Sequence, residues 1–243
     1  AQTLLAEAPS RLNRVVGSTA DPVQYDAKAN STAGQMITWV FIPLIGLSAM
    51  FAFERSNGTL RRWLVTPTSK ATFLGGTILG QGLTALVQMT ILIVFGIVVM
   101  GLKWGQSPAG LALVMISFTL AAAALGTMLG TFVKSEAQAN GLSILIGMLM
   151  AMMGGCWYPI ELFPAGVRSA AQALPTYWAM QGFLDIAVRG QGPAGVLQEC
   201  AVLLGFAALF FAAAAFASTS SQLQRWNNIG AVPEIVTCVR YGK

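Results

Sequence analysis

Long stretches without any charged residue constrain this chain more than any other feature of its sequence. A helix must carry about 20 consecutive apolar residues to cross the hydrocarbon core of a bilayer. Five uncharged runs approach or exceed that length: residues 36–53, 71–102, 108–133, 137–160 and 200–218. The sequence therefore predicts an all-α integral membrane protein with five transmembrane helices.

The overall composition supports this fold class against a soluble one. Hydrophobic residues make up 55% of the 243 residues and charged residues only 9%, whereas soluble domains carry about 25% charged residues. An unusually apolar soluble helical bundle is the alternative, but the polar residues are too few to cover its surface. The chain has no histidine, so it lacks the commonest general base and metal ligand.

The basic residues predict how the chain is oriented. The densest basic cluster lies in residues 54–70, and the positive-inside rule places such a loop in the cytoplasm. Alternation of the spans then divides the remaining connections between the two sides. We expect these segments outside the cell: 1–35, 103–107 and 161–198. We expect these inside: 134–136 and the tail from residue 219.

Three regions follow from this topology. Residues 1–35 form an extracytoplasmic segment, the end of a larger outer region. Residues 36–218 form the transmembrane domain, and residues 219–243 form a cytoplasmic tail. The expected location is the plasma membrane, which is the inner membrane of a bacterium. Lys and Arg form no long patch, so nucleic acid is not an expected partner.

The basic inner loop has the pattern of a short amphipathic helix. Leu60, Trp63 and Leu64 fall on one helical face, as in helices that lie at a membrane interface. Gly58 permits a sharp turn out of the preceding span, and Pro67 ends the helix. The loop is either a plain interfacial anchor or a docking surface for a cytoplasmic partner.

The segment after the fourth run carries prolines and interfacial aromatic residues. Pro159, Pro164 and Pro175 divide it into short pieces. Aromatic residues of the kind found in the outer belt of membrane proteins occur here: Trp157, Tyr158, Tyr177 and Trp178. We expect two short amphipathic helices that re-enter the outer leaflet as a hairpin, the alternative being a hairpin that lies flat on the surface.

Together these two segments resemble the permeases of the type-2 ATP-binding-cassette (ABC) exporter family. The inner motif matches at Glu54-Arg55, Gly58-Thr59-Leu60, Arg61-Arg62 and Thr66-Pro67. The outer motif matches at Gly155, Pro159, Leu162-Phe163-Pro164 and Leu174-Pro175-Thr176-Tyr177. The resemblance extends over residues 36–218. Members of the family have six spans, so we expect that the first span is missing here. They also often carry Gly-Lys after the inner loop, where this chain has Gly76-Thr77.

The resemblance implies a transport subunit and not an enzyme. It implies a dimer with a second permease copy, identical or different, in which each copy docks on a separate ATPase. ATP and magnesium would be held by that partner, with no cofactor, metal or catalytic residue in this chain. The chain accordingly lacks the phosphate-binding motif G-x-x-x-x-G-K-[ST].

The resemblance also assigns the two candidate sites. The loop coupled to the ATPase comprises Glu54, Arg55, Gly58, Thr59, Leu60, Arg61, Arg62 and Pro67. The outer re-entrant segment comprises Gly155, Pro159, Pro164, Pro175 and Tyr177. The expected function is outward movement of a lipid-like or amphipathic substrate or drug.

Other functions receive less support from the residues. An ion-coupled carrier or channel needs charged residues within its spans, and the five runs contain none. A membrane enzyme would need paired carboxylates or a histidine cluster near one face. A non-transporting membrane scaffold or assembly protein stays as the alternative function. Cys156 and Cys200 both fall near outer ends, where they form a disulfide or act as small apolar filler.

Overall fold

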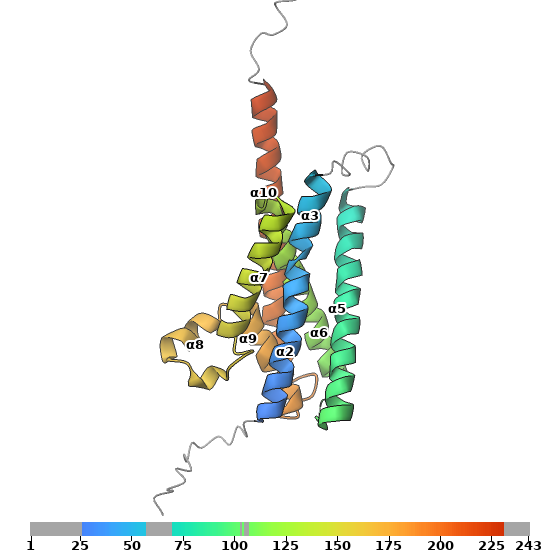
Figure 1. The fold of residues 1–243 in the computed structure, drawn as a ribbon, viewed down its shortest axis with the longest axis vertical. Helices are drawn as coiled ribbons and strands as arrows, with labels where there is room; N and C mark the ends of the chain where they lie inside the picture. Colours follow the sequence, from blue (N-terminus) through green and yellow to red (C-terminus); the bar gives the residue numbers. More distant parts are fainter. Residues whose placement is uncertain (1–25, 57–69, 103, 105–106, 231–243) are drawn as a thin grey trace, which may run out of the picture.

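The computed structural model describes residues 26–56, 70–102, 104 and 107–230. Long helices run side by side in a bundle, and short helices lie at one end of it (Figure 1). The helices that run along the bundle are α2 (Ala27–Ile45), α3 (Leu47–Ser56), α5 (Lys70–Met100), α6 (Pro108–Phe132), α7 (Glu136–Met153) and α10 (Leu197–Gly230). The helices at one end are η2 (Ile160–Leu162), α8 (Ala165–Ala171) and α9 (Pro175–Ala187). The predicted all-helical fold class is confirmed.

Four helical stretches in the described part of the chain are long and apolar enough to cross a membrane. They are Ala27–Glu54, Gly75–Met100, Pro108–Phe132 and Leu197–Ala217. The helix of the fourth predicted span, α7, is not among them, because its first turns carry Glu136, Gln138 and Asn140. The predicted count of five spans therefore stays a prediction. This helix ends at Met153 and not at residue 160, since Gly154 caps it.

Two helix ends differ from the sequence prediction. The first helix begins at Ala27, so residues 27–35 are helical and not loop. The side chain of Asp26 explains this start, because it accepts hydrogen bonds from the backbone N–H groups of Lys28 at 2.9 Å and Ala29 at 3.2 Å. At the other terminus α10 continues to Gly230, and no proline interrupts it. Residues 219–230, predicted to be a tail without pattern, are therefore helical.

A break after Pro43 divides the first span into α2 and α3. Gly46 lies between the two helices, and its N–H donates to the carbonyl of Ile42 at 3.0 Å. Pro43 has no N–H to donate to the carbonyl of Trp39 one turn earlier. The side-chain amide of Gln88 on α5 lies 3.5 Å from that carbonyl oxygen. A polar side chain of a neighbouring span thus approaches the group that proline leaves without a helical donor.

Helix α6 lies at the centre of the bundle and contacts α2, α3, α5, α9 and α10. Its most apolar stretch is 72% buried, against 22% for the corresponding stretches of α5 and α10. Large apolar side chains on α5 therefore face outward, where the acyl chains of a bilayer can contact them. They include Leu79, Leu83, Val87, Ile91, Phe95 and Val98.

Glycines on α6 allow the central helices to approach closely. A Cβ atom added to Gly126 would lie 2.6 Å from the carbonyl oxygen of Leu44, and one added to Gly130 would lie 3.0 Å from the ring of Phe51. Small residues serve this purpose in membrane helices because van der Waals packing drives their association. By contrast, a Cβ at Gly76 or Gly80 would have no neighbour within 4 Å. Of these two G-x-x-x-G pairs, Gly76/Gly80 on α5 and Gly126/Gly130 on α6, the pair on α6 is the one that packs described helices together.

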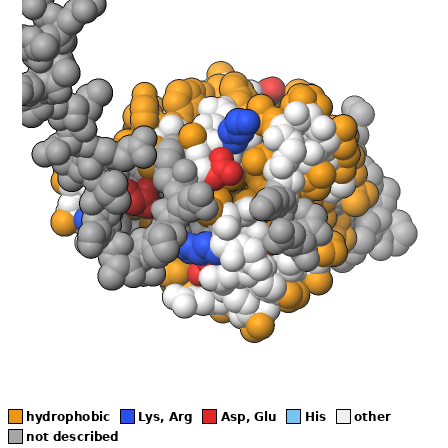
Figure 2. All heavy atoms as spheres, turned by 90° about the horizontal axis from the view of Figure 1, so that it is seen from below, with side chains coloured by type: hydrophobic (Ala, Val, Ile, Leu, Met, Phe, Trp, Pro, Cys, Tyr) orange, Lys and Arg blue, Asp and Glu red, His pale blue; other side chains and the backbone are white. Residues whose placement is uncertain are grey.

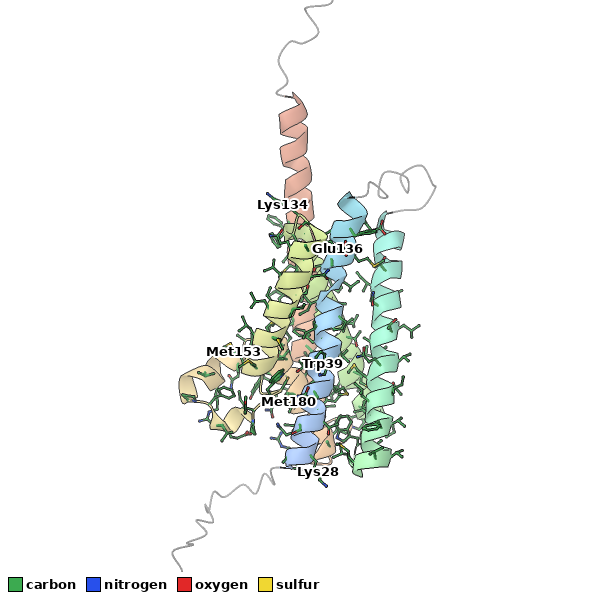
Figure 3. The ribbon with its side chains drawn as sticks, in the orientation of Figure 1. Lys28, Trp39, Lys134, Glu136, Met153 and Met180 are labelled. Carbon is green, nitrogen blue, oxygen red and sulfur yellow. The ribbon has the colours of Figure 1, made fainter. Side chains whose placement is uncertain are left out.

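The connections group at two ends of the bundle. The last turn of α3, the first turn of α5 and the α6–α7 connection lie at one end, which Figure 3 marks with Lys134 and Glu136. The first turn of α2, helices α8 and α9 and the first turn of α10 lie at the other end, near the label of Lys28 in Figure 3. The sequence predicts that the first of these ends is cytoplasmic and the second external.

The contact at Gly126 generates a first prediction. We expect Gly126→Ala to lower the free energy of unfolding by about 1–3 kcal/mol, because the new methyl group meets backbone that cannot move aside. Thermal unfolding of the purified protein in detergent measures the change. Gly80→Ala is the matched control and should leave the midpoint near that of the parent. Equal midpoints for the two variants would contradict the packing described for α6.

Candidate functional site

The inner candidate site lies largely outside the described residues. These predicted coupling residues fall there: Gly58, Thr59, Leu60, Arg61, Arg62 and Pro67. Glu54 and Arg55 belong to the last turns of α3, where Glu54 is half-buried. Helices α3 and α5, which flank the loop, meet it at the same end of the bundle (Figure 1). The coupling role of the loop stays a prediction.

A tight junction between α2 and the end of α7 forms the base of the outer candidate site. The chain leaves α7 through Gly154 and Gly155, and Gly155 has a φ of +86°, which strongly favours glycine. The carbonyl of the following residue, Cys156, lies against α2. A Cβ atom added to Gly34 would lie only 1.7 Å from that carbonyl oxygen. Glycine at 34 is therefore required for this contact.

Side-chain hydrogen bonds tie a third helix, α9, to this junction. The hydroxyl of Thr176 donates to the carbonyl of Met150 on α7 at 2.6 Å. On the other side, the indole N–H of Trp157 donates to the hydroxyl of Thr38 on α2 at 3.3 Å. Helices α2, α7 and α9 are thus joined at one place, which fixes where the outer segment begins.

The cysteines of this end do not form the disulfide considered from the sequence. Cys156 and Cys200 are both free, and both are buried. Cys156 lies at the junction and Cys200 in the first turn of α10. Both belong to the buried hydrophobic core, which agrees with the alternative role of small apolar filler, and Cys200 also forms a hydrogen bond with Ser117.

The prolines of the outer segment stand at helix starts. Pro159 precedes η2, Pro164 precedes α8, and Pro175 is the first residue of α9. Proline suits these positions because the first N–H groups of a helix have no partner within it. The two short helices predicted from the sequence are present as α8 and α9. Their depth in the membrane stays a prediction.

Helix α9 is packed inside the bundle and does not lie flat on its surface. It contacts α2, α6, α7 and α10, and it buries Ala179, Met180, Phe183 and Ile186. Trp104, from the connection between α5 and α6, stacks on Phe183 with ring centroids 6.1 Å apart. By contrast, α8 buries only Ala171. The outer segment therefore has one anchored and one exposed helix.

An open pocket of about 440 Å³ lies between these short helices. Helix α8 contributes one face at the spacing i, i+3, i+4, i+7. The lining residues are Ile160 and Glu161 of η2, Ala165, Arg168, Ser169 and Gln172 of the α8 segment, Tyr177 and Gln181 of α9, and Arg189. Of the outer residues predicted from the sequence, Tyr177 lines the pocket. Gly155 and the three prolines instead shape the chain around it.

Apart from Tyr177, sequence reasoning missed the pocket residues. It relied on the prolines and aromatic residues of this segment and not on the polar positions Arg168, Ser169 and Gln172, which repeat at helical spacing. That polar repeat is the signal that could have found them. Figure 2, which views the molecule from this end, shows basic and acidic side chains near the middle with hydrophobic ones around them.

A buried carboxylate lies beside the pocket. Asp185 is 4% exposed and forms an ion pair with Arg189, four residues later on the chain. Burial raises the pKa of Asp185, the charge and hydrogen bond of Arg189 lower it, and the charge of Glu199 raises it. Glu199 is also buried, and its Oε2 atom has no hydrogen-bond partner among the described residues. The structure thus brings together two carboxylates that the sequence did not predict to be paired.

Other sequence expectations concern charge and metals. The spanning stretch within α10 contains Glu199, and the first stretch contains Lys28 and Glu54, so charged residues occur at the ends of spans. Within the part of the chain that the structure describes, no three His, Cys, Asp or Glu side chains gather where they could hold a metal ion.

Comparisons with known proteins point to one family. The family model described as "ABC-2 family transporter protein" matches residues 16–216. The chain is 30% identical over 185 residues to the linearmycin resistance permease protein LnrN of Bacillus subtilis, an alignment of 76% of this chain and 48% of that protein. It is 28% identical over 178 residues to the inner membrane transport permease YhhJ of Escherichia coli, with 72% and 46% covered. The chain thus spans about half the length of these relatives. No solved structure matches it.

The hydrogen bond between α9 and α7 generates a second prediction. We expect Thr176→Val to lower the free energy of unfolding by about 0.5–1.5 kcal/mol, because valine keeps the shape but loses the donor. Detachment of α9 should also speed tryptic cleavage after Arg168. Thr90→Val is the control, since the hydroxyl of Thr90 donates to Leu86 within its own helix. Identical cleavage rates in parent and Thr176→Val would contradict the anchoring role.

Proposed function

This chain belongs to the ABC-2 family of transporter proteins, and we propose that it is the membrane-spanning permease subunit of an ATP-driven exporter. The match over residues 16–216 is the observation that carries this proposal. It confirms the resemblance stated from the sequence motifs. Family and apolar helices together identify a multi-pass protein of the cell membrane.

The proposed partner is a separate ATPase subunit. The chain has no phosphate-binding motif of the type G-x-x-x-x-G-K-[ST], so ATP and magnesium would be bound by the partner. The basic loop is the proposed contact, because α3 and α5 flank it at the end opposite α8 and α9. A movement at the loop would then pass directly into two helices of the bundle.

The proposed substrate is a lipid-like or amphipathic compound or drug that moves outward. The central helix α6 carries no charged side chain along its length, which offers little to a small ion. The relative from Bacillus subtilis is named as a resistance permease, and outward movement of a compound is a direct way for a permease to give resistance.

The proposed assembly is a dimer with a second permease copy, either identical or different. Both α5 and α10 expose most of their apolar stretches. The bilayer and a second copy would together cover these faces, because apolar helix surfaces are stable only against lipid or protein.

The inner loop provides the test of this function. We expect Gly58→Val and Arg62→Glu each to reduce substrate-stimulated ATP hydrolysis of the complex about tenfold or more. If the turn predicted at Gly58 has a positive φ, valine resists it by about 1–3 kcal/mol, and Arg62→Glu reverses a charge at the proposed contact. Both variants should still insert, since their spans are unchanged. Stimulated hydrolysis is measured after reconstitution of the purified complex in liposomes.

Controls separate this function from its alternative. Lys28→Gln, at the opposite end of the bundle (Figure 3), should leave stimulated hydrolysis at the parent level. Parent activity in both loop variants would show that the loop is only an interfacial anchor. Failure of any ATPase to co-purify, as judged by mass spectrometry, would favour the non-transporting scaffold.

A further inference from the structure

We propose that the pocket between η2, α8 and α9 binds the phosphate ester group of an amphipathic molecule, with Arg168 and Arg189 as the main ligands. The inference rests on the proposed function and deepens it, because it names the headgroup chemistry that an outward-moving compound or outer-leaflet lipid would present. The pocket volume of about 440 Å³ lies within the range of small-molecule sites, about 300–1,000 Å³.

The side chain of Arg189 is fixed in a position that leaves it able to bind an anion. Its Nη1 atom donates to the carboxylate of Asp185, which fixes the side chain against α9. A guanidinium has five N–H donors, so this ion pair leaves donors for a ligand, and the side chain is 37% exposed. The backbone is fixed as well, because the N–H of Arg189 donates to the carbonyl of Leu184 at 3.3 Å and Gly190 follows with a φ of +64°.

Arg168 supplies a second positive charge that forms no ion pair within the described part of the chain. It lies in the last turn of α8 and is exposed. No hydrogen-bond or ion-pair partner is found for it among the described residues. Ser169 and Gln172 line the pocket from the same helical face. Two guanidinium groups at one pocket are typical of sites for phosphate, which accepts several charge-assisted hydrogen bonds at once.

The remaining lining residues favour an ester with a single negative charge. The charged residues that line the pocket are Arg168, Arg189 and Glu161, and Asp185 is already paired with Arg189. Tyr177 and Gln181 add neutral donors from α9. The negative charge of Glu161 weakens binding of a dianion more than that of a monoanion. A phosphodiester therefore fits this set of charges better than a phosphomonoester.

Apolar surface next to the pocket points to a ligand with a hydrocarbon part. Leu162 follows the lining residue Glu161 and is 74% exposed. Tyr158 and Trp157 are exposed on the chain that leads to η2, and Leu149 and Met153 are exposed on α7. Met153 lies at the end of α7 that faces the short helices (Figure 3). A headgroup in the pocket would thus have Leu162 next to a lining residue, and further exposed apolar side chains on the segment before η2 and on α7, for contact with its hydrocarbon part.

Binding of dihexanoyl phosphatidylglycerol to the full chain in a neutral detergent tests this proposal. We expect Arg168→Gln and Arg189→Gln each to raise the Kd about tenfold or more, the loss of one charge-assisted contact. Glu161→Gln should lower the Kd by up to about fivefold, because it removes an exposed negative charge that repels the negatively charged phosphate. Lys28→Gln removes a positive charge at the same end without lining the pocket and should leave the Kd unchanged.

Two further ligands identify the group that is recognised. Dihexanoylglycerol, which lacks the phosphate, should bind at least tenfold more weakly than the phospholipid. Weaker binding of glycerophosphoglycerol, the same phosphodiester without acyl chains, than of the phospholipid would support a lipid source, and equal binding would support a soluble phosphodiester. Both results agree with the phosphate chemistry of the site.

Some results would contradict the proposed phosphate site and leave the transport proposal unaffected. An unchanged Kd in Arg168→Gln, which breaks no described contact, would do so even if Arg189→Gln fails to fold. So would equal binding of dihexanoylglycerol and the phospholipid. The measurement uses neither ATPase nor nucleotide, so its failure is separate from failure of the loop variants. If the chain binds the phospholipid but recruits no ATPase, the proposed phosphate site stands and the proposed exporter function is contradicted.

Discussion

Backbone-to-backbone contact of the first span with two other segments is the constraint on which the rest of the bundle depends. Gly34 lies against the carbonyl of Cys156, and Gly126 of α6 lies against the carbonyl of Leu44. Either contact would be lost if a side chain stood at the glycine. Apolar helices gain nothing from hydrophobic burial within lipid, so close van der Waals packing has to hold them together. These two contacts set the position of α2 between α6 and α7.

The contact at Gly34 also determines the outer end of the molecule. It holds the residue after the positive-φ turn at Gly155, so the chain leaves α7 in one direction only. The hydrogen bond from the Thr176 hydroxyl to the carbonyl of Met150 then holds the start of α9 against the end of α7. Between Gly155 and Thr176 the chain forms η2 and α8, and their polar faces line the pocket. Packing deeper in the bundle thus determines the geometry of the pocket.

Several hydroxyl side chains within the spans form hydrogen bonds that involve no charged group. The hydroxyls of Thr38, Thr84 and Thr90 donate to carbonyl groups one turn earlier in their own helices, a common arrangement for threonine in helices. Ser48 and Ser143 share a buried hydrogen bond of 3.1 Å between α3 and α7. The bundle therefore keeps its charged residues for its two ends, where the proposed partner and the proposed ligand would bind.

The sequence by itself determined the fold class, the family and the presence of two short outer helices. These follow from uncharged run length, motif order and proline positions, which are local properties of the chain. Helix ends were less accurate, because the Asp26 cap and the burial of α2 extend helix into polar residues. Only the tertiary structure decided that Gly126 and not Gly80 packs helices, and that Arg168 and Arg189 share a pocket. A glycine looks the same in sequence whether or not another backbone lies beside it. Two arginines, one on α8 and one just after α9, meet only once α2, α7 and α9 are joined.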